Sequence, residues 1–150
     1  MPGTYSQVLL HVVFSTKQRR PWLTSDVAER LHAYIGGIIR TGKGTLYAIG
    51  GAEDHLHLYL RSRTDDAISN LIRDVKAKSS AWIHANFPTL QTFAWQAGYA
   101  VFSVSKSQED AVKAYIAEQA EHHRKVDFKS ELLRLPRAHE IEFDERYVFD

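Results

Sequence analysis

The chain of 150 residues contains no cysteine and a single methionine. The absence of cysteine excludes disulfide bonds, thiolate zinc sites and a cysteine nucleophile. Any metal ion must therefore be held by histidine, carboxylate, amide or tyrosine groups. Such ligands suit Mg, Mn and Zn better than they suit thiophilic metals.

Long apolar runs and a strong net charge are also missing. No stretch is long enough to cross a bilayer, and residues Met1 to Gln7 lack the architecture of a signal peptide. We therefore expect a soluble, cytoplasmic protein with no membrane partner. The chain carries 19 Lys and Arg residues against 18 Asp and Glu residues, so its overall charge gives no indication of a nucleic-acid partner.

The basic side chains are nevertheless clustered along the sequence, and local clusters can attract an anionic partner. They are Lys17, Arg19 and Arg20, then Arg61 and Arg63, then Arg73, Lys76 and Lys78. We expect the first and last groups to contact DNA phosphates, although an ordinary solvated surface is the alternative for each.

The periodicity of apolar residues predicts one domain over residues 1–150, with the order strand, helix, strand, strand, helix, strand, helix. The predicted strands are Tyr5–Ser15, Thr45–Gly50, a histidine-bearing strand after a break at Gly50-Gly51, and Gly98–Ser105. The predicted helices follow Thr24-Ser25-Asp26, follow Asp65 or Asp66, and run from about Ala111 to His123 behind a capping box at Ser107-Gln108-Glu109-Asp110. This order is that of an α+β, ferredoxin-like split βαβ antiparallel sheet with an additional C-terminal helix. Two helices would cover one face of the sheet and leave the other for a site.

The histidine-bearing strand is the most informative segment. Because side chains alternate along a strand, His55, His57 and Tyr59 share one face, and the intervening leucines share the other, which we expect to be a core face. Two imidazoles placed in this way can converge on one metal ion. A pair of surface histidines is the alternative. We expect Asp54 to end a turn or to orient an imidazole rather than to bind a metal directly.

The last predicted helix carries Tyr115 and Gln119, which are four residues apart and so lie on the same face. A tyrosine is a poor nucleophile at neutral pH because it is almost entirely protonated. A nearby divalent cation can polarise the electrophile and stabilise the oxyanion that develops. Packing at the edge of the core is the alternative for Tyr115, and His122 and His123 are expected to be structural or to face DNA.

Four motifs carry a resemblance to a known family. They are Asp54-His55-Leu56-His57, Trp95-Gln96-Ala97-Gly98-Tyr99, Phe102-Ser103-Val104-Ser105 and Tyr115-x-x-x-Gln119. In their order and spacing the chain resembles the small single-tyrosine HUH transposases of bacterial insertion sequences, which act on single-stranded DNA, and their repeat-associated relatives. The resemblance extends from Tyr5 to about Tyr147.

The resemblance implies a division of labour among these residues. His55, His57 and Gln119 would bind a divalent metal ion, Mg or Mn by the chemistry of the ligands. Tyr115 would attack a DNA phosphate, leaving a 5′-phosphotyrosine and a free 3′-OH that can later rejoin strands. The resemblance also implies a homodimer acting on single-stranded or hairpin DNA. Trp95 and Tyr99 can stack on unpaired bases, with core packing as the alternative for Trp95.

The length and the helical periodicity of the chain argue against other classes of protein with a His-x-His motif. Metal-dependent amidohydrolases with a His-x-His motif need a barrel of roughly 250 residues, and cupins need an all-β fold. A ferredoxin-like RNA-binding module is a further alternative, although the chain lacks the glycine-aromatic signature of such domains. A domesticated relative that binds or nicks hairpin DNA without mobilising it would share the same site residues. An imperfect palindrome near each end of the gene would favour a mobile element.

Overall fold

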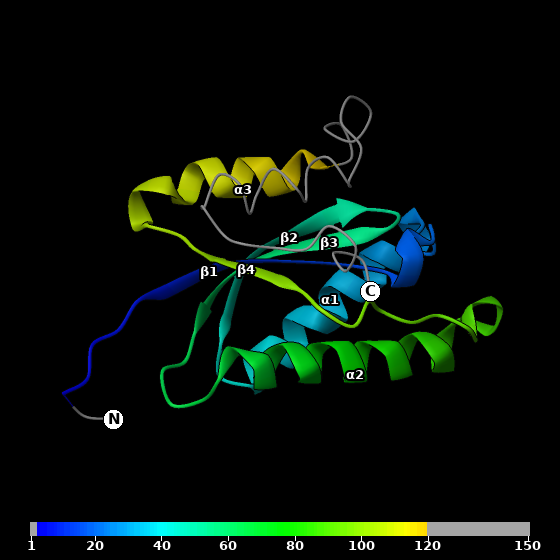
Figure 1. Cartoon of the computed structure of the whole chain (residues 1–150), viewed down its shortest axis with the longest axis horizontal. Helices are drawn as coiled ribbons and strands as arrows, with labels where there is room; N and C mark the ends of the chain where they lie inside the picture. Colours follow the sequence, from blue (N-terminus) through cyan, green and yellow to red (C-terminus); the bar gives the residue numbers. More distant parts are fainter. Residues whose placement is uncertain (1–2, 120–150) are drawn as a thin grey trace.

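In the computed structural model, which describes residues 3–119, a four-stranded antiparallel sheet lies between two layers of helices (Figure 1). The strands are β1 (Val8–Ser15), β2 (Thr45–Ala52), β3 (His55–Ser62) and β4 (Ala100–Ser103). Their order in the sheet is β2-β3-β1-β4, with every neighbouring pair antiparallel. The predicted α+β, ferredoxin-like split βαβ arrangement is confirmed.

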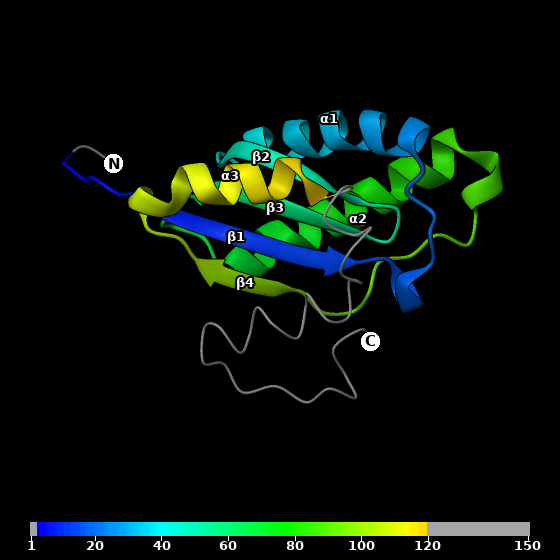
Figure 2. The same ribbon diagram turned by 90° about the horizontal axis from the view of Figure 1, so that it is seen from above.

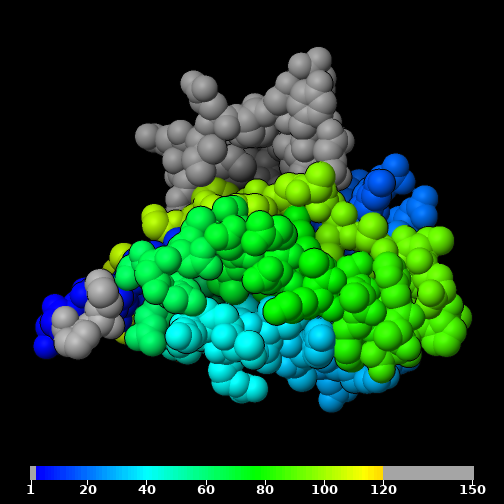
Figure 3. All heavy atoms as spheres, turned by 90° about the horizontal axis from the view of Figure 1, so that it is seen from below, coloured from blue at the N-terminus to red at the C-terminus, as the bar shows by residue number. Residues whose placement is uncertain are grey.

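The three helices divide between the two faces of this sheet. Helices α1 (Ser25–Thr41) and α2 (Ile68–Asn86) cover one face, and α3 (Glu109–Ala117) lies across the other (Figures 1 and 2). Figure 3 views the molecule from the side of α1 and α2, whose atoms form much of that surface. The second face, which the sequence assigns to the site, is therefore not left open but carries the C-terminal helix.

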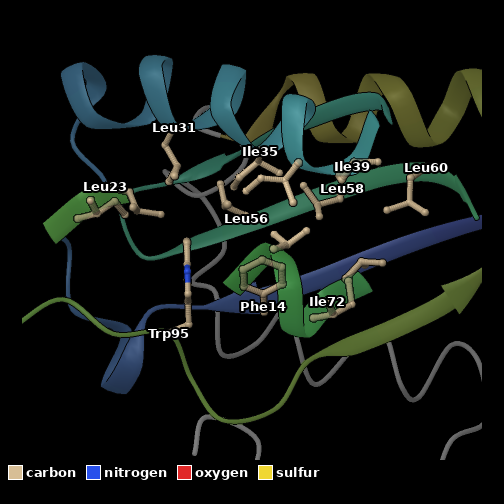
Figure 4. Packing of buried hydrophobic residues seen from close by; sticks show 14 of the residues in the cluster. Phe14, Leu23, Leu31, Ile35, Ile39, Leu56, Leu58, Leu60, Ile72 and Trp95 are labelled. Atoms are coloured by element: carbon tan, nitrogen blue, oxygen red, sulfur yellow. The ribbon is translucent and has the colours of Figure 1, made fainter. Parts of the chain in front are cut away.

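The main core lies between the sheet and the pair α1 and α2. Leu56, Leu58 and Leu60 of β3 are fully buried, which confirms the predicted core face. They pack with Leu31, Ile35 and Ile39 of α1, with Ile72 of α2 and with Phe14 of β1 (Figure 4). This apolar layer holds β3 in place, so the alternate residues of the strand must face α3.

Trp95 belongs to the same core. Its side chain is 8% exposed, and its indole N–H donates to the Ser79 hydroxyl oxygen over 3.0 Å. Its ring also packs edge-on against Phe14. Core packing, and not base stacking, is therefore the role of Trp95.

The glycine pair at Gly50-Gly51 does not break the chain, so that prediction is wrong. Strand β2 runs through both residues, with Gly50 opposite His57 and Gly51 opposite Leu56. A Cβ on Gly50 would lie 2.5 Å from the carbonyl oxygen of Ile116 in α3, and one on Gly51 would lie 2.1 Å from a carbonyl of β3. The glycines are needed because backbone approaches closely, which is a recognised use of glycine inside a strand.

Several predicted ends also shift. Strand β1 begins at Val8 instead of Tyr5, and β4 is shorter than the predicted Gly98–Ser105. The N-cap residue of helix α2 is Ala67, and neither Asp65 nor Asp66 occupies that position. Asp66 precedes the N-cap, and its carboxylate accepts a hydrogen bond from the Ala67 N–H.

The capping box predicted for α3 does not form. A 3₁₀ turn at Lys106–Gln108 leads into the helix, and the N-cap residue, Gln108, makes no side-chain capping bond. The predicted continuation to His123 and the apolar tail lie outside the described residues. Within residues 3–119, no helix is both long and apolar enough to span a membrane.

Candidate functional site

The two histidines of β3 lie beneath α3. Both side chains are fully buried, and their ring centroids are 5.1 Å apart at an interplanar angle of 78°. A pair of surface histidines is therefore the wrong interpretation of His55 and His57. Polar groups buried to this degree need hydrogen-bonding partners, and the structure supplies one for each Nδ1 atom.

The imidazole of His55 is held between a carboxylate and an amide. Its Nδ1 lies 2.8 Å from Oδ1 of Asp54, and its Nε2 lies 3.0 Å from Oε1 of Gln119. An ionised carboxylate can only accept, so Nδ1 carries a proton. Asp54 thus has the orienting position that was expected for it, on the side of the ring away from Gln119.

The imidazole of His57 is held by a residue that sequence reasoning missed. Its Nδ1 lies 2.8 Å from Nε2 of His11, and the two rings are stacked with centroids 5.0 Å apart. His11 is in β1 and is 6% exposed. The signal in the sequence is that His11 interrupts the otherwise apolar run from Val8 to Phe14, which marks it as a buried polar group.

Helix α3 and the turn after it bring the predicted tyrosine and glutamine to these histidines within one chain, with Tyr115 in the helix and Gln119 two residues past its end. The Tyr115 ring meets His57 edge-on, with centroids 5.4 Å apart. Gln119 is 1% exposed, and its amide N–H donates to the carbonyl of Tyr115 over 3.1 Å, which leaves Oε1 directed at His55. The hydrogen bond from Gln119 to the Tyr115 carbonyl keeps these two residues together, so that Tyr115 contacts His57 and Gln119 contacts His55.

Ion pairs stabilise the first turn of α3. Glu109 is 8% exposed and pairs with Lys106 and with Lys113, the latter over 3.5 Å. Hydrogen bonding from Lys106 holds the pKa of Glu109 below its ordinary value. The buried Tyr59 lies nearby, and its burial together with the Glu109 carboxylate raises its pKa. The raised pKa keeps Tyr59 in its neutral form, in which a tyrosine is a poor nucleophile.

The donor atoms around His55 fit a cation. Because Asp54 accepts from Nδ1, a neutral His55 presents a lone pair on Nε2 to the carbonyl oxygen of Gln119, so that two acceptors face each other at 3.0 Å. A metal ion between such atoms, or a proton on the ring, removes the repulsion. Among residues 3–119, no three His, Asp or Glu side chains form a metal-binding cluster. Within the described residues, the amide oxygen of Gln119 lies 3.0 Å from Nε2 of His55, where it could serve as a further protein ligand.

Comparison with known proteins agrees with this arrangement. The family model described as "Transposase IS200 like" matches residues 4–119, which include both histidines, Tyr115 and Gln119. The chain belongs to the IS200-like transposase family. The activity that this family shows for the chain is that of a DNA transposase.

Individual relatives of this IS200-like transposase are distant in sequence. The ISDra2 transposase TnpA of Deinococcus radiodurans is 23% identical over 122 residues, which cover 78% of this chain and 87% of that protein. A crystal structure of a candidate transposase from Deinococcus radiodurans R1 has a TM-score of 0.67 at 24% identity, covering 79% of this chain and 95% of that one. The structure of a REP-associated tyrosine transposase bound to a REP hairpin has a TM-score of 0.62 at 18% identity, covering 84% and 74% of the two chains. Both structures share the fold.

The basic residues that were predicted to contact DNA lie in two parts of the transposase. Lys17, Arg19 and Arg20 lie in and after the 3₁₀ turn Lys17–Arg19, which is tied to the strand bearing the histidines because the Thr16 N–H donates to the Asp54 carbonyl over 2.9 Å. Arg73 and Lys78 are exposed on α2, across the sheet from α3 (Figure 1). The structure therefore places only the first group at the same end of β3 as His55.

Lys76 differs from the other predicted DNA contacts. Its ammonium group donates to the carbonyls of Gln96 and Gly98, over 2.9 and 2.5 Å, and burial lowers its pKa to about 8. Gln96 in turn accepts from the Ser15 N–H at the end of β1. These contacts favour a role for Lys76 in fixing the segment that leads into β4 over the predicted contact with phosphate.

Proposed function

We propose that this IS200-like transposase cleaves and rejoins single-stranded DNA at hairpin-flanked ends, with Tyr115 as its nucleophile and a divalent metal ion as its cofactor. The observation that carries the proposal is the docking of α3 and the turn after it, which sets Tyr115 against His57 and Gln119 against His55 in one site.

The residues present fit a metal such as Mg or Mn, held by His55, His57 and Gln119. Bound there, the ion would polarise a phosphate oxygen and offset the charge that develops in the transition state. The Tyr115 hydroxyl oxygen attacks the phosphorus and loses its proton, and the bond from phosphorus to the 3′ oxygen breaks. The products are a 5′-phosphotyrosine and a 3′-OH. Attack of a 3′-OH on the phosphotyrosine reverses the step, so the ester conserves the bond energy and no ATP is needed.

Hairpin DNA is proposed as the partner on two grounds. A structural neighbour with the same fold is bound to a REP hairpin, and the exposed residues Lys17 and Arg20 lie near the Asp54 end of the site, where they can contact phosphates. Arg19, Arg73 and Lys78 extend the proposed contact surface. The homodimer implied by the family stays a prediction.

The decisive test is capture of the covalent intermediate. A 3′-labelled single strand carrying a hairpin should form a protein–DNA adduct that survives denaturing electrophoresis, and a perfect duplex should form none. Tyr115→Phe removes only the hydroxyl, so the variant should still fold and bind the hairpin while the adduct disappears. Tyr34→Phe is the matched control because Tyr34 stacks on Trp82 on the far side of the sheet.

Two results would contradict the proposal. An adduct formed by Tyr115→Phe would mean that another tyrosine is the nucleophile. Cleavage by the wild-type protein with no adduct at all would identify a hydrolytic nuclease that uses water.

A further inference from the structure

We propose that His11 is a positioning residue that holds His57 in the tautomer with its proton on Nδ1, so that Nε2 is the nitrogen available to a metal. The inference rests on the proposed function in that it concerns the same site. It assigns a role to a residue that lies outside the His-x-His and tyrosine motifs.

The first support is the placement of His11 in the sheet. Strand β1 lies between β3 and β4, and His11 stands opposite Tyr59 on one side and Phe102 on the other. Its side chain is 6% exposed and points to the same face as His57, whose own backbone partner is Val13, two residues further along β1. A residue in a central strand with neighbours on both sides has little freedom to move, which is what a positioning residue requires.

The second support is the chemistry of the contact between the two rings. Nε2 of His11 and Nδ1 of His57 are 2.8 Å apart, so for neutral rings one nitrogen carries the proton and the other accepts it. If His57 donates from Nδ1, its Nε2 keeps a lone pair. If His11 donates instead, Nε2 of His57 carries the proton and cannot bind a metal. The direction of this hydrogen bond therefore determines whether Nε2 of His57 can bind a metal.

The third support is the matching arrangement at His55. There too the Nδ1 atom is engaged by a neighbour, the Asp54 carboxylate, which forces the proton onto Nδ1 and leaves Nε2 to face Gln119. Metal-binding histidines commonly donate their second N–H to such a partner, which fixes the ring and its tautomer. His11 completes the same arrangement for His57, with a neutral imidazole in place of a carboxylate.

The tautomer can be measured directly in the metal-free protein. Long-range ¹H–¹⁵N spectra of the imidazoles at neutral pH distinguish a proton on Nδ1 from one on Nε2. We expect the Nδ1–H form for His57 in the wild type and loss of that preference in His11→Leu, which removes the acceptor but keeps an apolar side chain in the core. A His57 signal of the Nε2–H form in the wild type would overturn the proposal.

Metal affinity provides the second readout. Calorimetric titration with Mn²⁺ should show binding weaker by about 10- to 100-fold in His11→Leu, the usual effect of losing such a partner. His11→Gln offers an amide oxygen near the position of Nε2, so it should recover most of the affinity. His84→Leu is the matched control. It removes a 2.8 Å contact between an imidazole of α2 and the Phe93 carbonyl, on the face of the sheet opposite α3, and should leave Mn²⁺ affinity unchanged.

The outcomes separate this inference from the proposed function. Mn²⁺ affinity in His11→Leu equal to that of the wild type would refute the role of His11 while leaving the metal site intact. No Mn²⁺ binding by the wild type would refute the metal assignment of the proposed function. In that case the tautomer spectra would still decide whether His11 holds His57.

Discussion

Each imidazole of the site is restrained at its Nδ1 atom by one neighbour, Asp54 for His55 and His11 for His57. A buried polar ring without such a partner would destabilise the fold. With the partner, the ring is both stabilised and oriented. At the residue scale, the same hydrogen bonds that permit burial also orient the two rings, and the bond to Asp54 leaves Nε2 of His55 facing Gln119.

The first prediction at this scale is metal dependence. EDTA should abolish cleavage of hairpin DNA, and Mg²⁺ or Mn²⁺ should restore it. His57→Ala should reduce cleavage to background while hairpin binding stays within a few-fold, because phosphate contacts by basic residues dominate affinity. Cleavage rates and gel-shift affinities check both statements. Full cleavage in the presence of the chelator would disprove the metal assignment.

The second prediction concerns Lys76, whose pKa burial lowers to about 8 from 10.5. Between these values the unfolded chain binds more protons than the folded one, so this group makes the free energy of unfolding rise with pH. Urea denaturation should therefore show the wild type gaining stability relative to Lys76→Met as the pH is raised from about 7 to about 10. Lys78→Met, at an exposed position of the same helix, should show no such trend. Parallel pH profiles for the wild type and Lys76→Met would contradict the burial of the ammonium group.

At the scale of elements, the site depends on how closely α3 approaches the sheet. Gly50 makes that approach possible, because a Cβ there would lie 2.5 Å from the Ile116 carbonyl. Ile116 is the neighbour of Tyr115 in α3 and is itself buried. The position of the tyrosine is therefore coupled to a strand residue that has no side chain.

Gly50→Ala should push α3 away from β2 and destabilise the protein by about 1–3 kcal/mol, as overpacking does. The yield of the adduct with single-stranded DNA should fall at least tenfold, since Tyr115 lies in α3 and Gln119 closely follows it, so both are displaced when the helix moves. Gly36→Ala is the matched control, because its new Cβ would meet only a Leu46 methyl at 3.7 Å. Because Gly36 lies in the interior of α1, where alanine is favoured over glycine, Gly36→Ala should stabilise the protein by about 0.5–1 kcal/mol. Chemical denaturation and the adduct assay measure both effects, and wild-type adduct yield in Gly50→Ala would refute the coupling.

At the scale of the whole molecule, the net charge is only +1, but basic residues are concentrated in two areas. One is the turn around Lys17–Arg20, and the other is the exposed side of α2 with Arg73 and Lys78. Each phosphate contact on single-stranded DNA should add about 0.7 to the slope of log affinity against log salt concentration. Arg20→Ala and Arg73→Ala should each lower that slope by about this amount for every hairpin sequence alike. Arg30→Ala is the control, since its guanidinium packs over Trp82 and Phe87 on the outer side of the helices. Unchanged slopes in both variants would mean that these areas do not contact phosphates.

The sequence was sufficient for features that depend on local periodicity. Alternation in β3 separated the leucines from the histidines, and helical spacing placed Tyr115 and Gln119 on one face. It was insufficient at Gly50-Gly51, where the glycines were interpreted as a break. Gly50 allows the backbone of a helix about 65 residues away in the chain to approach closely. The residues next to Gly50 in the sequence carry no signal of this contact.

What the sequence determined by itself is therefore the order of elements and the two faces of β3. Both follow from spacing, which acts between near neighbours, whereas the roles predicted for His55, His57, Gln119 and Tyr115 come from the resemblance to a family. Only the tertiary structure decided that α3 covers the histidine face, that His11 contacts His57 across strands and that Lys76 is used to hold the segment before β4. Those contacts join residues at least 20 positions apart. They arise because packing of the main core leaves one sheet face to be completed, and no local pattern encodes which distant side chains meet there.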